Sequence, residues 1–241
     1  MSGKKHILVV EDEQHLAIGI KYNLEAEGYR VSVAGDGPEA LRIFEANPDN
    51  IDLVILDLML PGMSGYAVCE RIRASHRSVP IMILSARTLS EDRTRGFDVG
   101  ADQYMMKPFD LDELLSRVKG LLAAYARRSE ADAAHTPKLT RYAVGDAEID
   151  FEKFEVAAGG QTVRMTQLEM RLLEYFIDNE GRVIPRGELL ENVWELPATI
   201  QTRAPDQFIH RLRKVFEKDP AKPAHFLTIR DVGYRFVAAG E

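Results

Sequence analysis

The segment Ile51–Asp57, with the sequence IDLVILD, constrains the fold of this chain more than any other. A short run of β-branched and aliphatic residues between turn-forming residues is typical of a strand buried on both faces of a parallel sheet. Asp57 stands at the carboxyl end of this run. Because burying a carboxylate is costly, we expect Asp57 to emerge at the carboxyl edge of the sheet, where open α/β sheets bind their ligands.

Three further strand-like runs also end in polar side chains. Residues 6–10 (HILVV) precede Glu11 and Asp12, residues 80–84 (PIMIL) precede Ser85, and residues 103–106 (QYMM) precede Lys107. If the strands are parallel, all these side chains meet Asp57 at one edge of the sheet. Each residue alone has a more ordinary explanation, such as a solvated turn. Their occurrence at successive strand ends predicts a common site.

Length and composition bound the kind of protein. The chain has 241 residues, enough for two domains of ordinary size. Its net charge of −7 excludes a uniform basic attraction to nucleic acid but not a local basic surface. Its single cysteine, Cys69, rules out an internal disulfide and fits a reducing cytosol. We recognise neither a signal peptide nor a long apolar run, and we expect a cytoplasmic protein without a membrane segment.

The pattern of strands and helices divides the chain into two predicted domains. Residues 5–126 alternate strand and helix five times, which favours right-handed crossovers and a five-stranded, parallel, doubly wound α/β sheet in a domain spanning 1–126. Residues 127–138 lose this periodicity and are interpreted as a linker, although their alanines leave a continued helix open. Residues 139–241 are interpreted as an α+β domain of short antiparallel strands, three helices and a closing hairpin.

The acidic side chains at the sheet edge favour phosphoryl chemistry. Glu11, Asp12 and Asp57 would repel one another, and a hard divalent cation such as Mg²⁺ removes that conflict. A carboxylate beside Mg²⁺ can attack a phosphoryl group and form an acyl phosphate. The ammonium of Lys107 and the hydroxyl of Ser85 would then contact the phosphoryl oxygens.

Residues 5–126 resemble the receiver domain of two-component response regulators, which has the flavodoxin-like fold. The resemblance rests on the acidic pair and Asp57 and on two motifs, LMLPGMSG at 58–65 and KPF at 107–109. It implies that Asp57 is the phosphoacceptor and that Lys107 stabilises the phosphoryl group. Ser85 stands at the switch hydroxyl position and Tyr104 at the aromatic switch position, so these two are the implied switch residues. The implied Mg²⁺ ligands are Glu11, Asp12, Asp57 and the backbone carbonyl of Met59.

The same resemblance implies a homodimer that forms on phosphorylation, through the fourth helix, fifth strand and fifth helix. One departure affects this face, because the usual acidic pair before the aromatic switch residue reads Asp102-Gln103 here. The residues that we expect to form ion pairs between subunits are Arg93, Asp98, Asp102, Glu113 and Arg117.

Residues 139–238 resemble the winged helix-turn-helix domain of the OmpR/PhoB subfamily. The motifs are MTQLE at 165–169, RLRK at 211–214 and GYRF at 233–236. In the third predicted helix, residues 205–217, the apolar side chains share one side and the basic ones point the opposite way, which predicts a recognition helix in a major groove. The expected DNA contacts are Gln207, His210, Arg211 and Lys214 on that face, Arg203 and Arg213 at phosphates, and Arg230 at the wing.

Two departures bear on these DNA contacts. Ala204-Pro205 stands where the subfamily has a small or β-branched pair, and Asp231 stands at a wing-turn position that is commonly Gly. The segment 195–202, between the second and third helices, is the part that touches RNA polymerase in the subfamily.

The sequence therefore predicts a DNA-binding regulator of transcription that a sensor histidine kinase phosphorylates at Asp57, and whose only catalysis is phosphoryl transfer to and from its own Asp57. Two other functions remain open. A phosphatase with an Asp nucleophile would need a second Asp at position 59, which is Met. A DNA-binding protein with a merely structural receiver would not respond to a phosphodonor.

Overall fold

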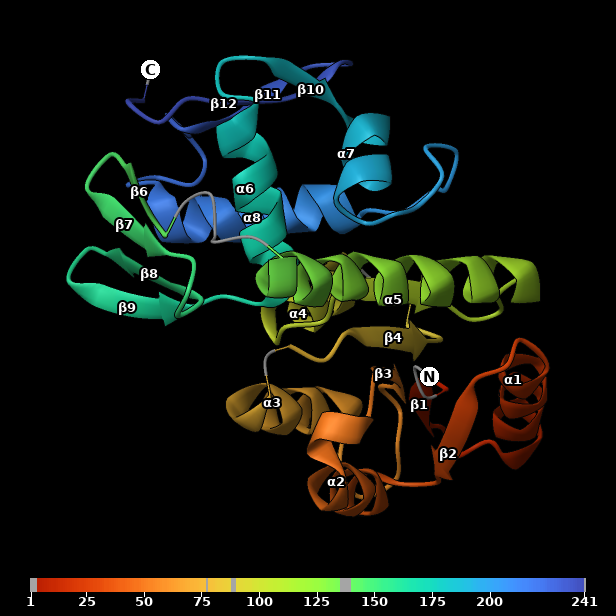
Figure 1. Ribbon diagram of the computed structural model, residues 1–241. Helices are drawn as coiled ribbons and strands as arrows, with labels where there is room; N and C mark the ends of the chain where they lie inside the picture. Colours follow the sequence, from red (N-terminus) through yellow and green to blue (C-terminus); the bar gives the residue numbers. More distant parts are fainter. Residues whose placement is uncertain (1–3, 77, 88–89, 135–139, 241) are drawn as a thin grey trace. The chain divides into compact units, whose positions relative to one another are not determined.

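A five-stranded parallel sheet forms the N-terminal half of the computed structural model, which describes residues 4–76, 78–87, 90–134 and 140–240 (Figure 1). The strands are β1 (His6–Val10), β2 (Arg30–Ala34), β3 (Leu53–Asp57), β4 (Ile81–Ser85) and β5 (Gln103–Met106). Their order is β2-β1-β3-β4-β5, so the direction of winding reverses between β1 and β3. Ligands of open α/β sheets bind at such a switch point. Glu11, Asp12 and Asp57 follow or end these two strands.

Helices cover both faces of this sheet (Figure 1). They are α1 (Gln14–Ala26), α2 (Gly37–Ala46), α3 (Gly65–Ser75), α4 (Ser90–Asp98) and α5 (Leu111–Ala134), and a 3₁₀ turn spans Pro48–Asn50. Alternate strand residues face opposite sides. Leu8 and Val54 pack with α2 and α3, whereas Val9 and Ile55 pack with α1 and α5. The sheet is thus buried on both faces, as the apolar runs predict.

Local capping fixes where several helices begin and end. Ser64 caps α3 as predicted, because its hydroxyl accepts the backbone N–H of Ala67. The predicted capping box at the start of α6 (Gln167–Asp178) is present, with Thr166 and Glu169 each accepting the other's backbone N–H. Gly28, just past the end of α1, has a φ of +90°. Many α-helices end in a residue with such a left-handed backbone conformation, which glycine adopts easily.

The C-terminal half forms two antiparallel sheets and three helices in its described residues. One sheet contains β6 (Arg141–Val144), β7 (Ala147–Asp150), β8 (Glu155–Ala158) and β9 (Gln161–Arg164); the other has β10 (Val183–Pro185), β12 (Gly233–Phe236) and β11 (Phe226–Ile229) in that order. The helices are α6 (Gln167–Asp178), α7 (Arg186–Asn192) and α8 (Ala204–Phe216). A hairpin of β11 and β12 after three helices is the winged-helix arrangement.

A core of large apolar side chains holds α8 in place. Phe208, Ile209 and Leu212, which the helical periodicity places on one side, are each at most 1% exposed. The ring of Phe208 meets Trp194 edge to face, with centroids 5.2 Å apart. This packing confirms the predicted orientation of the apolar side of α8.

The structure differs from the sequence interpretation between the two halves. The chain divides into two compact units between Leu122 and Ala123. Helix α5 continues through Ala134, so residues 127–134 of the predicted linker are helical, and residues 135–138 lie outside the described residues. The alanines of this segment favour helix, which accounts for the continuation. Among the described helices, none combines the length and the apolar character needed to cross a membrane.

Candidate functional site

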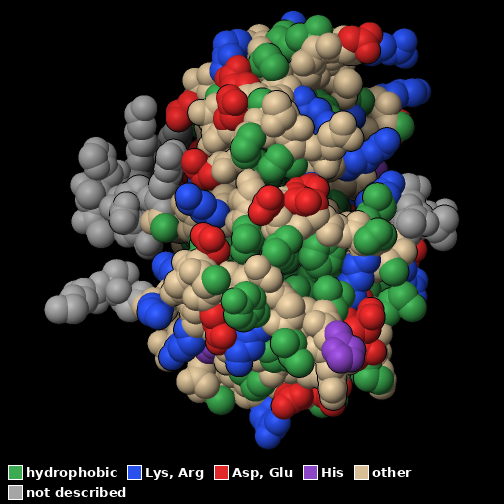
Figure 2. All heavy atoms as spheres, turned by 90° about the vertical axis from the view of Figure 1, so that its right-hand side faces the viewer, with side chains coloured by type: hydrophobic (Ala, Val, Ile, Leu, Met, Phe, Trp, Pro, Cys, Tyr) green, Lys and Arg blue, Asp and Glu red, His purple; other side chains and the backbone are tan. Residues whose placement is uncertain are grey.

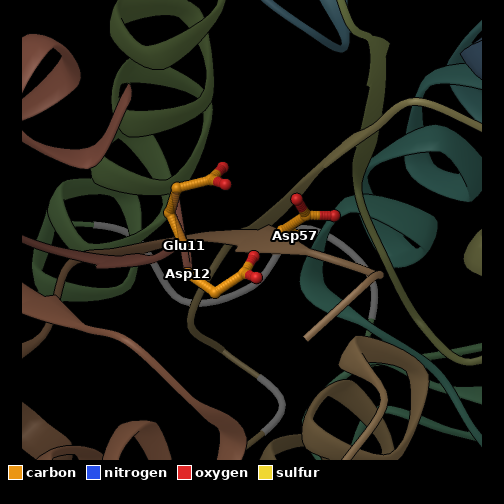
Figure 3. A group of neighbouring side chains, drawn as sticks. All are labelled: Glu11, Asp12 and Asp57. Atoms are coloured by element: carbon orange, nitrogen blue, oxygen red, sulfur yellow. The ribbon is translucent and has the colours of Figure 1, made fainter. Parts of the chain in front are cut away.

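Three carboxylates converge at the carboxyl edge of the first sheet (Figure 3). Glu11 and Asp12 follow β1 and Asp57 ends β3, and an oxygen from each lies within 4.8 Å of the others. Glu11 and Asp57 are buried and Asp12 is exposed. The sequence prediction that these three residues meet is confirmed.

Lys107 brings a positive charge into the same site from the loop after β5. Its ammonium nitrogen lies 2.5 Å from Asp57 Oδ2 and 2.7 Å from Glu11 Oε2. Burial lowers the pKa of Lys107, but its hydrogen bonds and charge pairing with Asp57 and Glu11 outweigh that effect, and the net pKa is raised. Lysine therefore stays charged in the site.

One lysine does not balance the three acidic side chains, and the site therefore suits a cation. Burial raises the pKa of Glu11, and this effect outweighs the opposing hydrogen bond from Lys107. Burial disfavours the charged form of a carboxylate, and a hard divalent cation, which prefers oxygen ligands, stabilises that charged form. The donor set of Glu11, Asp12 and Asp57 fits such an ion. A metal ligand at the Met59 carbonyl remains a prediction.

The loop after Asp57 depends on a glycine that can approach the backbone closely. A Cβ on Gly65 would lie 2.1 Å from the backbone oxygen of Asp57, so any other residue there would displace the loop. The backbone N–H of Met59 donates to Asp57 Oδ1 at 2.9 Å. The loop thus orients the carboxylate of Asp57 through the backbone N–H of Met59.

Ser85 and Tyr104 lie on neighbouring strands close to this site. Ser85 is fully buried, and its hydroxyl oxygen accepts the backbone N–H of Arg87 at 3.1 Å. The ring of Tyr104 is already turned inward, with the residue 6% exposed, and its hydroxyl donates to the backbone oxygen of Arg87 at 3.2 Å. Gly96 of α4 lies against this ring, because a Cβ there would be 3.1 Å from Tyr104 Cδ2.

The residues predicted for a dimer face do not all lie at the surface. Asp98 is exposed, and Arg93 and Glu113 are half-buried. Arg117, by contrast, is buried and donates to Glu113 Oε1 at 2.6 Å and to Gln103 Oε1 at 2.9 Å. The expectation that Arg117 is available to a partner is wrong for this arrangement, since one turn of helix brings Glu113 to it.

Asp102 was also expected at this face, and the structure buries it completely. Its Oδ2 accepts from Arg73 at 2.7 Å and from the backbone N–H of Ile81 at 2.8 Å. Arg73 in turn donates to the backbone oxygens of Gly100 and Val79. The prediction for Asp102 is therefore corrected: its carboxylate joins α3, β4 and β5 inside the first unit. Arg73 was missed because its partner is distant in sequence.

The predicted DNA-contacting residues of α8 fall into two groups. His210 and Lys214 are exposed and Gln207 is half-buried, as expected for a face available to DNA. Arg203, before α8, and Arg230, beside the hairpin turn, are exposed as well. Acidic and basic side chains are interspersed on the face that Figure 2 presents.

Two arginines of α8 form contacts within the second unit instead. Arg211 lies 2.9 Å from Glu169 Oε1, whose carboxylate side chain is 1% exposed. Arg213 donates to the backbone oxygen of Phe226 and to the hydroxyl of Thr228. The expectation that Arg211 points away from the protein is therefore wrong, because α6 supplies a buried acid that pairs with it.

A further contact that sequence reasoning missed fixes the start of α8. Asp206 accepts a 2.5 Å hydrogen bond from the hydroxyl of Tyr234 on β12 and lies 2.8 Å from Arg186 of α7. Burial and then this hydrogen bond to Asp206 raise the pKa of Tyr234. An Asp in the first turn of a helix is the only local signal for such a contact.

Comparison with known proteins agrees with this arrangement of two units. Residues 7–119 match the family described as response regulator receiver domain, and residues 160–236 match the family described as transcriptional regulatory protein, C terminal. The sensory transduction protein RegX3 of Mycolicibacterium smegmatis is 39% identical over 95% of this chain and 97% of its own length. The DNA-binding response regulator MtrA of the same organism is 40% identical over 96% of each chain.

A solved structure extends the likeness to the fold of the whole chain. A mutant of the protein RitR has a TM-score of 0.69 and 26% sequence identity, covering 96% of this chain and 98% of that one. The receiver and effector families together account for both units. The chain therefore belongs to the OmpR/PhoB family of two-component response regulators, and it is a DNA-binding regulator of transcription.

Proposed function

We propose that Asp57 is the phosphoacceptor and that a sensor histidine kinase supplies the phosphoryl group. The observation that supports this role most directly is the position of Asp57, at a strand end, 2.5 Å from Lys107 and beside two further carboxylates. Asp57 is oriented by the N–H of Met59, so that one carboxylate oxygen is held while the other faces Lys107. This is the arrangement that a carboxylate nucleophile needs.

Mg²⁺ would be held by Glu11, Asp12, Asp57 and the backbone carbonyl of Met59, and when bound it would neutralise charge on the phosphoryl oxygens. An oxygen of Asp57 attacks phosphorus and forms an acyl phosphate. The bond from phosphorus to the imidazole nitrogen of the donor breaks, and the imidazole keeps the electron pair and takes up a proton. Lys107 binds one phosphoryl oxygen and Ser85 donates a hydrogen bond to another. Attack of water on phosphorus later breaks the bond between phosphorus and the Asp57 oxygen, which releases inorganic phosphate and returns Asp57 to the free carboxylate.

Phosphorylation would then promote a homodimer and binding to promoter DNA in the cytoplasm. Arg93, Asp98 and Glu113 are the residues of the predicted dimer face that remain accessible. Exposed ion pairs contribute only about 0–1 kcal/mol each, so dimerisation would also need apolar contacts from α4 and α5. Two half-sites about 10–10.5 bp apart would place both copies of α8 on one side of the duplex.

The residues of the second unit would divide the work of DNA binding. Gln207, His210 and Lys214 would face base edges, while Arg203 and Arg230 would contact backbone or minor groove. Arg213 would brace the hairpin through Phe226, so its effect on DNA would be indirect. RNA polymerase is the further partner, at the segment between α7 and α8.

Beryllofluoride, a phosphoryl analogue, tests this function with the whole chain. With Mg²⁺ it should raise both self-association in sedimentation and affinity for DNA with two half-sites, and EDTA should abolish both effects. DNA binding that is equally tight with and without beryllofluoride would instead indicate a DNA-binding protein with a merely structural receiver.

A further inference from the structure

Tyr66 links two elements of the first unit through a buried hydroxyl. It is the second residue of α3 and is 4% exposed. The hydroxyl donates to the backbone oxygen of Asp92 on α4 at 3.0 Å and lies 3.3 Å from Asp92 Oδ1. The guanidinium carbon of Arg95 lies 4.4 Å from the centre of the Tyr66 ring. Both the hydroxyl and the ring of Tyr66 therefore contact α4.

The beginning of α3 is held firmly against the phosphoacceptor strand. Gly65, next to Tyr66, leaves no room for a side chain because its Cβ would lie 2.1 Å from the backbone oxygen of Asp57. Its N–H donates to the backbone oxygen of Leu58 at 3.1 Å. Tyr66 thus projects toward α4 from a backbone whose distance from Asp57 is fixed.

Asp92 continues the contact to the segment after Ser85. Its Oδ1 accepts from Arg87 at 2.9 Å. The backbone of Arg87 is in contact with both switch residues, because its N–H donates to Ser85 Oγ and its carbonyl oxygen accepts the hydroxyl of Tyr104. A continuous set of hydrogen bonds therefore runs from Tyr66 to Tyr104 by way of Asp92 and Arg87.

The Arg87–Asp92 pair alone is a weak anchor. The Arg87 side chain is 46% exposed, and ion pairs at the surface contribute little because water screens them and long side chains lose entropy. The Asp92 side chain is 15% exposed, and the hydroxyl of buried Tyr66 contacts both the backbone oxygen of Asp92, at 3.0 Å, and its Oδ1, at 3.3 Å, which ties Asp92 to α3. Burial, and then the Asp92 charge, raise the pKa of Tyr66 to about 12, so its hydroxyl remains a donor at neutral pH.

We propose that Tyr66 is a positioning residue of the phosphorylation switch: through Asp92 it holds Arg87 where the carbonyl oxygen of Arg87 accepts the hydroxyl of buried Tyr104. The inference rests on the proposed function of Asp57 and adds a route from the phosphoacceptor loop to α4 that does not pass through Ser85. Loss of the Tyr66 hydroxyl should release Tyr104 from its inward position without touching the chemistry at Asp57.

The test compares Tyr66→Phe with Tyr22→Phe, a matched control because Tyr22 is 72% exposed on α1. Each full-length variant is labelled with 3-fluorotyrosine, and the Tyr104 resonance is assigned with Tyr104→Phe. For Tyr66→Phe we expect unchanged phosphorylation of Asp57 by acetyl phosphate and a Tyr104 resonance shifted toward that of an exposed tyrosine. Dimerisation with beryllofluoride should weaken by about two- to tenfold, the range for one hydrogen bond. Tyr22→Phe should match the wild type.

A second variant guards against a general loss of structure. Asp92→Asn keeps an acceptor for Tyr66 but loses the charge that holds Arg87, so it should shift the Tyr104 resonance in the same direction. Combined with Tyr66→Phe it should add little, because both changes break one set of contacts. A Tyr66→Phe protein that is phosphorylated, dimerises as tightly as the wild type and keeps the Tyr104 resonance would overturn this inference alone. A wild type that is neither phosphorylated at Asp57 nor dimerised would overturn the proposed function as well.

Discussion

Removing the carboxylate of Asp102 should destabilise the first unit strongly, even with no second copy of the chain present. Asp102 is 0% exposed and the Arg73 side chain is 6% exposed. In Asp102→Ala, the guanidinium of Arg73 would lose its 2.7 Å partner, and the N–H of Ile81 would lose its 2.8 Å acceptor. Both donors would remain buried.

The size of the effect follows from these two losses. Breaking a buried ion pair by removing one partner costs about 3–5 kcal/mol, because a charge is left uncompensated. The remaining bonds of Arg73, to the backbone oxygens of Gly100 and Val79, keep its side chain in place and prevent it from swinging to water. With an m-value of about 1–3 kcal/mol/M in urea, the midpoint should fall by more than about 1 M.

Urea unfolding of the full chain measures this loss. Far-UV circular dichroism follows both units, whereas the fluorescence of Trp194, the chain's one tryptophan, follows the second unit. Asp102→Ala should lower the transition of the first unit and leave the tryptophan transition in place. The control is Asp98→Ala, an exposed position where we expect a change within about 0.5 kcal/mol. A loss below about 1 kcal/mol in Asp102→Ala, with dimerisation alone impaired, would refute the structural role of this carboxylate.

Three further predictions test other contacts. Arg211→Ala should destabilise the second unit by about 1–3 kcal/mol, because the carboxylate of Glu169 stays buried without its cation. Urea unfolding followed by Trp194 fluorescence measures this loss. Unchanged stability, with loss of preference for one base pair in DNA, would instead support a base-reading role for Arg211. Gly96→Ala should weaken beryllofluoride-induced dimerisation, since its Cβ would press on the ring of Tyr104; sedimentation as in the wild type would contradict that contact. Burial, and then the charge of Arg30, lower the pKa of His6 from 6.5, so the folded state favours neutral His6. The stability that neutral His6 contributes is therefore lost as the pH falls through its folded-state pKa. Urea unfolding should therefore show that the wild type loses more stability than His6→Gln between about pH 7.5 and 5.5. Equal losses of stability in the two proteins would contradict this prediction.

The sequence predicts the first unit well where the signal is local and repeated. The apolar run before Asp57 can bury both faces only between two layers of helices, which fixes the sheet and the edge where Glu11 and Asp12 meet it. The strand ends then place Ser85 and Lys107 beside Asp57 without knowledge of any other contact. The same logic of period orients α8 by Phe208 and Leu212.

The predictions that were wrong concern partners distant in the sequence. Helical geometry places Arg211 opposite the apolar side but says nothing of Glu169, which another helix brings against it. From the sequence alone Asp102 is expected at the surface, because Arg73, the cation that pairs with it in the interior, lies on α3. The three-residue strand β10 escapes notice because it is too short for a period and includes Pro185.

The most direct test of the central claim is phosphorylation of wild type and Asp57→Asn by radiolabelled acetyl phosphate, with the modified residue mapped by mass spectrometry. The amide keeps the volume of the side chain but is a poor nucleophile and a weaker metal ligand. We expect Mg²⁺-dependent labelling of the wild type at Asp57 alone and none above background in Asp57→Asn, with the fold retained by circular dichroism. Comparable labelling of Asp57→Asn, mapped to Asp12 or to any other residue, would contradict the account.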